Sequence, residues 1–94
     1  MNLRKEARGR ECQVREPGIC NGDNSTTVLA HLNGAGMGMK HHDLFGAWAC
    51  SNCHDLLDGR NHAKIYSRQH RELIHLQAML RTQKALLSEG KIKT

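Results

Sequence analysis

Four cysteines are the residues of this sequence whose type and spacing point most directly to chemistry. Two residues separate Cys50 from Cys53, and this spacing lets two thiolates bind one ion while the backbone turns round it. Cys12 and Cys20 bound a longer segment with a Pro-Gly turn signal, which can fold back and supply two more ligands. Four soft thiolates in tetrahedral geometry suit zinc, and a closed four-ligand site is structural. The alternative, a redox pair or disulfide at Cys50 and Cys53, leaves Cys12 and Cys20 unexplained.

A histidine and an aspartate beside the second cysteine pair form another candidate site. His54 follows Cys53 directly and Asp58 lies four residues later, so in a helix both side chains share one face. His31, near the end of an apolar segment, could point at the same ion. Such a group suits phosphodiester hydrolysis, with His54 and Asp58 holding Mg²⁺ or another divalent ion and His31 accepting a proton from water. In the simpler interpretation, His54 only supports the zinc ligands and Asp58 caps a turn.

Turn and cap signals indicate the elements that must position these residues. In chain order we expect a strand, a glycine-rich loop, a second strand and a short helix, at residues 26–32, 33–40, 44–49 and 52–58. Ser51 is a suitable N-cap for the short helix, and Gly59 stands where a glycine commonly ends one. The order strand, loop, strand, helix is a ββα unit.

A longer helix is expected near the end of the sequence. Ser67 is its N-cap candidate and Gly90 its stop signal, which predicts about 20 helical residues. One helical stripe carries four leucines, Leu73, Leu76, Leu80 and Leu87, and is flanked by Ile74, Met79 and Leu86. We expect this stripe to pack over the ββα unit and to supply most of the core. A coiled-coil dimer is the alternative, for which the stripe is short.

The chain is short for building a large apolar core. Its 94 residues correspond to one domain, and its aromatic residues are limited to Phe45, Trp48 and Tyr66. Such a core commonly needs disulfides or a metal. We find no secretory signal at the start and no stretch of membrane-spanning length, so we expect a reducing, intracellular setting that favours metal over disulfides.

The charge balance is basic. Fourteen Lys and Arg against nine Asp and Glu give a net charge of +5, which fits a polyanionic partner such as nucleic acid. The simpler interpretation is that this charge keeps a small protein in solution. Residues 1–10 are basic without apolar periodicity, and we expect them to form a mobile arm or a short helix.

Several segments together resemble the HNH endonucleases, and more narrowly the small phage and prophage nucleases typified by YbcO. The Ala-His-Leu strand, the Gly-rich loop and the Cys-x-x-Cys-His-Asp segment carry the HNH likeness. The narrower likeness covers nearly the whole chain and rests on Leu3-Arg4-Lys5, Arg8-Gly9-Arg10-Glu11-Cys12, Pro17-Gly18-Ile19-Cys20-Asn21, Ala30-His31-Leu32, Ala49 to Asp55, and Arg81-Thr82-Gln83.

The resemblance implies a DNA nuclease encoded by a phage or prophage and acting in the bacterial cytoplasm. It implies that His31 is the general base, that His54 is a ligand of the catalytic metal and that Asp58 is a second ligand. Two positions depart from the HNH pattern. The residue before the first histidine is Ala30 rather than an acidic residue or histidine, and Phe45 stands at the usual place of the central asparagine.

Two further residues are candidates to compensate for these departures. Asp43 is the nearest polar residue to the missing asparagine, and a solvated loop residue is the simpler interpretation of it. His62, four residues after Asp58, is a spare metal-ligand candidate.

We therefore expect a small α+β protein with a zinc-stapled, HNH-like ββα-metal core, an N-terminal cysteine loop and a C-terminal helix. Residues 1–94 form one domain, with a basic arm at 1–10, the cysteine loops and core at 11–62, and the helix at 67–90. Its structural ion is Zn²⁺ at the four cysteines, and its catalytic ion is Mg²⁺ or another divalent metal.

The expected function is metal-dependent hydrolysis of DNA, duplex or branched, without a membrane partner. Phosphate contacts, which make binding salt-dependent, are expected from five basic residues: Arg4, Lys5, Arg8, Arg10 and Lys40. The main alternative is a catalytically inactive zinc protein that binds DNA or assists recombination. A weaker alternative is a protein-interaction adaptor that uses the long helix.

Overall fold

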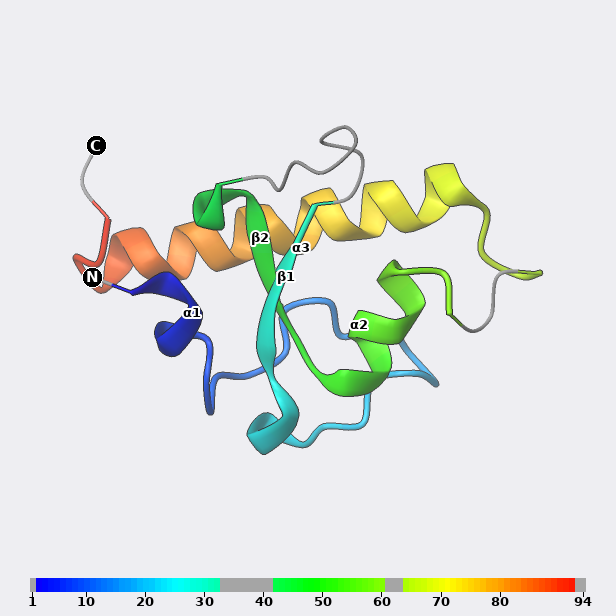
Figure 1. Cartoon of the computed structure of the whole chain (residues 1–94), viewed down its shortest axis with the longest axis horizontal. Helices are drawn as coiled ribbons and strands as arrows, with labels where there is room; N and C mark the ends of the chain where they lie inside the picture. Colours follow the sequence, from blue (N-terminus) through cyan, green and yellow to red (C-terminus); the bar gives the residue numbers. More distant parts are fainter. Residues whose placement is uncertain (1, 33–41, 61–63, 93–94) are drawn as a thin grey trace.

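The computed structural model describes residues 2–32, 42–60 and 64–92. Two short helices and one long helix pack around a two-stranded sheet (Figure 1). The elements are α1 (Leu3–Glu6), η1 (Asn24–Thr26), β1 (Val28–His31), η2 (Asp43–Phe45), β2 (Gly46–Ala49), α2 (Ser51–Leu57) and α3 (Arg68–Ser88). No helix within the described ranges is long and apolar enough to cross a membrane.

The two predicted strands are present and pair antiparallel. Val28 lies opposite Ala49 at one end of the pair, and His31 lies opposite Gly46 at the other. Each strand is shorter than predicted, because a 3₁₀ turn, η1 or η2, precedes it. Gly46 suits this register, since a Cβ there would stand 2.9 Å from the Leu29 side chain and would force it to shift. In Figure 1 both strands cross α3 steeply, so the sheet meets the long helix near its middle.

The short helix follows the second strand as expected, but its N-cap is Cys50 rather than Ser51. The Cys50 sulfur accepts the Cys53 backbone N–H at 3.4 Å. The Ser51 hydroxyl instead accepts the Asn21 side-chain amide at 3.1 Å. The helix ends at Asp58, and Gly59 follows with φ +73°, the left-handed conformation that glycine adopts at low cost. The predicted stop at Gly59 is therefore confirmed.

The long helix begins and ends close to its predicted signals. The Ser67 hydroxyl accepts the His70 backbone N–H at 3.1 Å, and Gly90, with φ +72°, follows the last turn. These caps account for the observed range Arg68–Ser88.

The predicted core face of α3 is wrong. The leucine stripe is exposed, with relative accessibilities of 53% for Leu73, 42% for Leu76, 60% for Leu80 and 43% for Leu87. The opposite face is buried and consists of Ile74, His75, Ala78, Thr82 and Leu86. Small residues at its centre let the helix approach Ala47 and Ala49 of β2 closely, where bulky leucines would hold it away.

Small residues and cysteines make up much of the main core. Its buried members are Cys12, Val14, Ala30, Ala47, Ala49, Cys50, Cys53, Leu57, Ile74 and Ala78. A second, smaller cluster joins Ala7, Trp48 and Leu86. With few large aliphatic side chains, the apolar contribution to stability is modest, as the composition predicted.

The outer edge of β2 is covered by side-chain and backbone partners. The Trp48 backbone N–H donates to the Thr82 hydroxyl at 3.0 Å, and that hydroxyl donates to the Ala78 carbonyl at 2.9 Å. The Trp48 carbonyl accepts the Gln13 N–H at 2.7 Å. Thr82 is 1% exposed, so its hydroxyl satisfies a buried donor that the two-stranded sheet leaves unpaired.

We expect Thr82→Val to lower the free energy of unfolding by about 1–3 kcal/mol, because the isosteric methyl leaves the Trp48 N–H buried without an acceptor. Denaturant unfolding of the metal-loaded protein measures this. Thr82→Ser keeps the hydroxyl and is the matched control, with a smaller loss. Equal losses for the two variants would contradict this assignment of the hydrogen bond.

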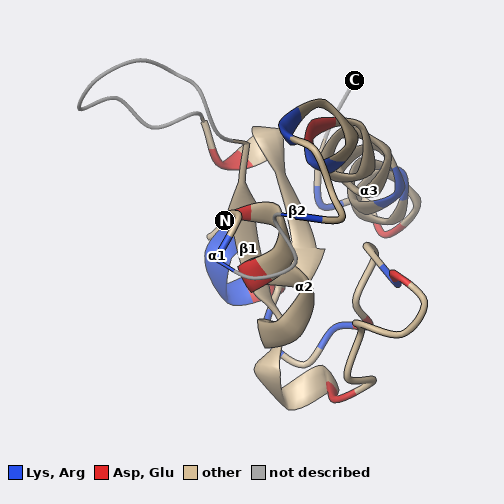
Figure 2. Cartoon of the chain, turned by 90° about the vertical axis from the view of Figure 1, so that its right-hand side faces the viewer, with Lys and Arg blue, Asp and Glu red and all other residues tan. Residues whose placement is uncertain are grey.

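For residues 1–10 we expected either a mobile arm or a short helix, and the structure shows the short helix α1. Figure 2 shows α1 beside β1, with α3 beyond β2 on the other side of the sheet. The Arg10 guanidinium donates two hydrogen bonds to the Glu89 carboxylate, both 2.6 Å long. Its central carbon lies 4.8 Å from the centre of the Trp48 ring. Arg10 therefore ties the N-terminal segment to the end of α3, and its role as a phosphate contact stays a prediction.

Candidate metal centre and neighbouring histidines

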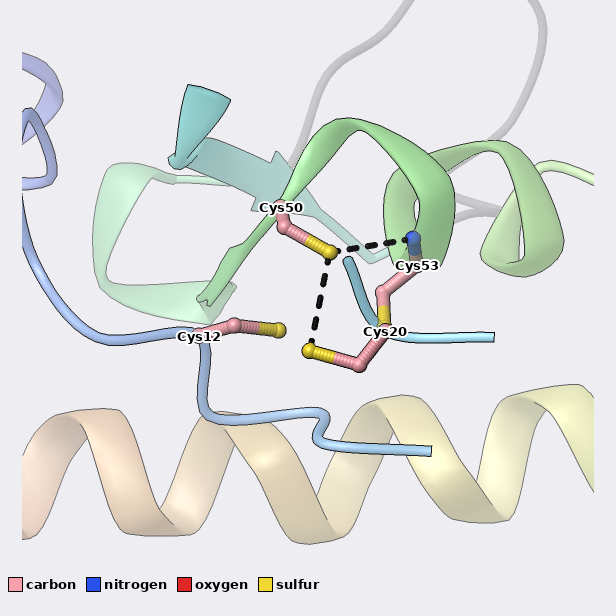
Figure 3. Close-up of side chains that lie close together, drawn as sticks. All are labelled: Cys12, Cys20, Cys50 and Cys53. Atoms are coloured by element: carbon pink, nitrogen blue, oxygen red, sulfur yellow. Dashed lines mark hydrogen bonds between the residues drawn. The ribbon is translucent and has the colours of Figure 1, made fainter. Parts of the chain in front are cut away.

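The four cysteines converge as their spacing predicted. Their sulfur atoms all lie within 4.8 Å of one another, and none forms a disulfide. Cys12 and Cys20 come from the irregular segment before β1, whereas Cys50 and Cys53 begin α2 (Figure 3). The cluster therefore joins the N-terminal segment to the end of the sheet and to the short helix.

Backbone turns direct amide groups at these sulfurs. The Cys12 segment turns at Arg15, whose φ of +51° is unusual for a residue with a side chain. Contact with the Cys53 thiol lowers the pKa of Cys12, and the Arg15 backbone amide adds to this effect. Gly22 turns the Cys20 segment with φ +69°. Burial raises the pKa of Cys20, and the Gly22 amide partly offsets that rise. Turns of this kind, with amides aimed at the sulfurs, stabilise thiolates.

The thiols hold their protons unequally. Contact with the Cys53 thiol lowers the pKa of Cys12 to about 4. The same contact, together with burial, raises the pKa of Cys53, and burial raises the pKa of Cys20. Four adjacent thiolates would repel one another at this depth, and a bound divalent cation would compensate their charge.

The donor set fits a tetrahedral metal ion such as zinc. Zinc–sulfur bonds of about 2.3 Å place tetrahedral sulfur atoms about 3.8 Å apart. The sulfur atoms of Cys20 and Cys50 are 3.8 Å apart. Three of the four cysteines are buried, with Cys20 half-buried, so the cluster forms a closed centre rather than one open to substrate.

His31 contacts Asp43 across twelve residues of sequence. Its Nε2 lies 2.7 Å from the Asp43 Oδ1, and that oxygen also accepts the Arg4 Nε–H at 3.3 Å. The hydrogen bond from His31, with further help from Arg4, lowers the pKa of Asp43, so the carboxylate is charged at neutral pH. A charged carboxylate can only accept, so a neutral His31 ring in this contact would carry its proton on Nε2, with Nδ1 as the basic nitrogen.

His54 and Asp58 lie on one face of α2, as their spacing predicted. The His54 Nε2 is 3.4 Å from the Asp58 Oδ2, and the Arg60 guanidinium lies 3.5 Å from the same oxygen. Arg60 also contacts Asp55 at 3.1 Å. His54 is half-buried and Asp58 is exposed, so each is accessible to a ligand from solution.

The predicted convergence of His31, His54 and Asp58 on one ion is not observed. Within residues 2–32, 42–60 and 64–92, the cysteines are the only group of three or more potential ligands close enough to share a metal. His31 belongs to a separate pair because β1 carries it to Asp43.

Sequence reasoning missed His75. It is 2% exposed, and its Nε2 lies 2.7 Å from the carbonyl oxygen of Ala30, the residue before His31. Burial lowers the pKa of His75, and the charges of Asp58, His54 and His31 act on it as well, so the ring lies among these candidates. The apolar residues on both sides of it in the sequence are the only signal that could have indicated burial.

A cleft of about 370 Å³ lies next to these residues. The end of α2 and the first half of α3 line it, with Leu32 at one margin. Its polar lining consists of Asp58, Arg68, Arg71, Glu72 and His75. Asp58 thus borders an open space that also carries two guanidinium groups.

Comparison with known proteins places these features in a family. The family model described as "Putative nuclease YbcO" matches residues 1–91. The chain belongs to the YbcO family. It is 48% identical over 95 residues to "Putative nuclease YbcO" of Escherichia coli strain K12, covering 98% of this chain and 97% of that protein. The protein of the same description from Enterobacteria phage 82 matches equally.

A solved structure has the same fold. It is described as a putative bacteriophage protein from Escherichia coli K-12, is 46% identical and has a TM-score of 0.79, covering 95% of this chain and all of that one. The phage and prophage connection predicted from the sequence motifs is thus supported by the YbcO relatives.

The basic candidates of this YbcO-family chain differ in availability. Lys5 and Arg8 are exposed, and Arg4 is exposed although it pairs with Asp43 (Figure 2). These three residues lie on or just after α1. Lys40 and His62 lie outside the described residues.

Proposed function

We propose that this chain is a divalent-metal-dependent DNA endonuclease of the HNH type with a separate structural zinc. The observation that carries the proposal is the 2.7 Å contact between His31 and Asp43, which prepares a histidine to act as a base. The names of the YbcO relatives support nuclease chemistry. The direct test is nicking of supercoiled plasmid by the purified protein with Mg²⁺ or Mn²⁺, compared with the same reaction in EDTA.

In this proposal the cysteine centre is structural. Its burial leaves no open ligand position, and its sulfur set suits Zn²⁺ rather than the oxygen-preferring Mg²⁺. Zinc at Cys12, Cys20, Cys50 and Cys53 holds the start of α2, and thereby His54, against the strands.

His31 acts as the general base. The carboxylate of Asp43 fixes the ring, and Nδ1 takes the proton from the water that attacks phosphorus. Asp43 thus orients His31 from a position two residues before Phe45, which stands at the usual place of the central asparagine.

His54 and Asp58 hold the catalytic ion. When bound, a divalent ion neutralises charge on the scissile phosphate and on the leaving oxygen. Asp58 borders the cleft, so substrate phosphate can reach it, and Arg68 and Arg71 add positive charge beside it. Arg4, Lys5 and Arg8 bind flanking phosphates near His31, because Arg4 already contacts Asp43.

We expect Asp43→Ala to lower kcat by about tenfold or more with little change in KM, because His31 loses its orienting partner but substrate contacts remain. Steady-state nicking rates measure this.

The contact between His31 and Asp43 should also depend on pH. Since the pKa of Asp43 is lowered, its carboxylate loses its charge only when the pH falls below the usual pKa range of an aspartate. The His31 contact should therefore persist down to mildly acidic pH. Asp43→Asn keeps an acceptor and is the matched control, and a similar loss in both variants would argue against a purely orienting role.

One observation favours a second candidate, a zinc-stabilised DNA-binding protein without catalysis. Ala30, at the usual position of an HNH metal ligand, is 1% exposed and offers no ligand atom. This candidate predicts DNA binding without cleavage in any divalent metal.

A further inference from the structure

The exposed leucine stripe of α3 consists of Leu73, Leu76, Leu80 and Leu87. Leu76 also lines the cleft beside Asp58, but the fold and the proposed activity give no reason for the exposure of the other three. Each helical residue turns by about 100°, so Leu80 lies about 200° from Ala78, at the centre of the buried face. The helix is therefore apolar on two opposite sides, one against β2 and one toward solvent. Helices that are apolar on both sides are normally covered on both.

We propose that the stripe is the interface of a two-fold symmetric dimer, in which two copies of α3 pack antiparallel. Leu73, Leu80 and Leu87 repeat every seven residues and are symmetric about Leu80. A two-fold axis at Leu80 brings Leu80 against its own copy and Leu73 against Leu87 of the second copy. These three leucines are thus self-complementary, as an isologous interface requires, whereas Leu76 faces Lys84 of the second copy.

The leucines alone would supply about 700 Å² of buried area in such a dimer, less than the about 1,200 Å² of a standard interface, so flanking side chains must supply the rest. The four accessibilities sum to about two whole leucine residues per copy, on the order of 350 Å² of mostly apolar surface. Two copies, together with the neighbouring glutamine and lysine side chains along a helix about 31 Å long, approach the lower limit of about 1,200 Å² for stable interfaces.

The chemistry of the stripe favours a second copy over nucleic acid. Three glutamines, Gln69, Gln77 and Gln83, border the leucines, and the two charged residues nearest to them, Glu72 and Lys84, have opposite signs. A face without net positive charge gives no attraction for phosphate. This inference does not depend on the proposed nuclease activity.

The test is the molar mass of the full-length, metal-loaded protein in solution. Light scattering at about 100 µM should give twice the 10.6 kDa of one chain. Leu80→Glu should raise the dissociation constant by about 100-fold or more, because it places two like charges at the two-fold axis. Ile65→Glu is the matched control: Ile65 is 77% exposed but lies before α3, so the dimer should be unaffected.

A charge pair tests the antiparallel register. Leu73→Glu should weaken association, and the double variant Leu73→Glu, Leu87→Lys should restore it because opposite charges then meet. Unchanged circular dichroism and metal content show that each variant is folded. A monomeric wild type at this concentration, a dimer that survives Leu80→Glu, a dimer lost in Ile65→Glu or absence of rescue would each overturn the proposal.

Discussion

Replacing Cys53 by serine is expected to leave the protein unfolded under conditions in which the wild type is folded. Metal binding at four thiolates contributes on the order of 10 kcal/mol to folding in small zinc domains. The net stability of a domain is about 5–15 kcal/mol, and the alanine-rich core here offers little in reserve. Thermal unfolding followed by circular dichroism, with metal analysis of the purified protein, measures both effects. We expect about one zinc per wild-type chain and a marked loss in the variant.

Chelation separates the metal contribution from packing. Cys53 is fully buried, so its replacement also disturbs the core. A strong chelator applied to the wild type leaves packing groups intact and should cause the same unfolding, which added zinc should reverse. Asn52→Ser, an exposed change between the two cysteines of α2, is the matched control and should unfold like the wild type. A metal-free protein with an unchanged melting temperature would refute the structural-zinc assignment.

Replacing His31 by alanine is expected to reduce the nicking rate by about 10²–10⁴-fold, the usual contribution of a positioned general base. DNA affinity at low salt should change little, because the exposed Lys5 and Arg8 take no part in the contact of His31 with Asp43 and Arg4. Plasmid nicking in Mg²⁺ or Mn²⁺ gives the rate, and fluorescence anisotropy with a labelled duplex gives the affinity. His70→Ala, at an exposed histidine near the start of α3, is the matched control and should retain activity.

The possible outcomes separate the two candidate functions. A wild type that binds DNA but cleaves none in any divalent metal supports the non-catalytic alternative. Cleavage that is equal in the wild type and His31→Ala would assign the base to another residue. Cleavage lost in His31→Ala and retained in His70→Ala supports the nuclease proposal. Since both variants keep the cysteines, loss of the fold cannot explain such a difference if metal content is unchanged.

Local signals in the sequence determined the positions of most elements. Ser67 and Gly90 bounded the long helix because a hydroxyl cap and a left-handed residue act within one turn. The cysteine cluster was also predictable. The four cysteines occur as two pairs in a chain with a small apolar core, and one shared metal ion is the simplest explanation of both pairs. The same holds for His54 and Asp58, whose separation of four residues places them on one helical face.

Tertiary structure alone decided which face of α3 is buried. Periodicity identifies an apolar stripe but not its partner, and here the strands select the opposite face because Ala78 and Thr82 permit close approach. The burial of His75 follows from the same docking, since only the strand brings the Ala30 carbonyl to its ring. The contact of His31 with Asp43 likewise depends on how the chain returns after β1, which no local spacing specifies. The sequence by itself thus determined the helices and the sulfur ligands, whereas long-range packing decided which side chains meet at the candidate catalytic site.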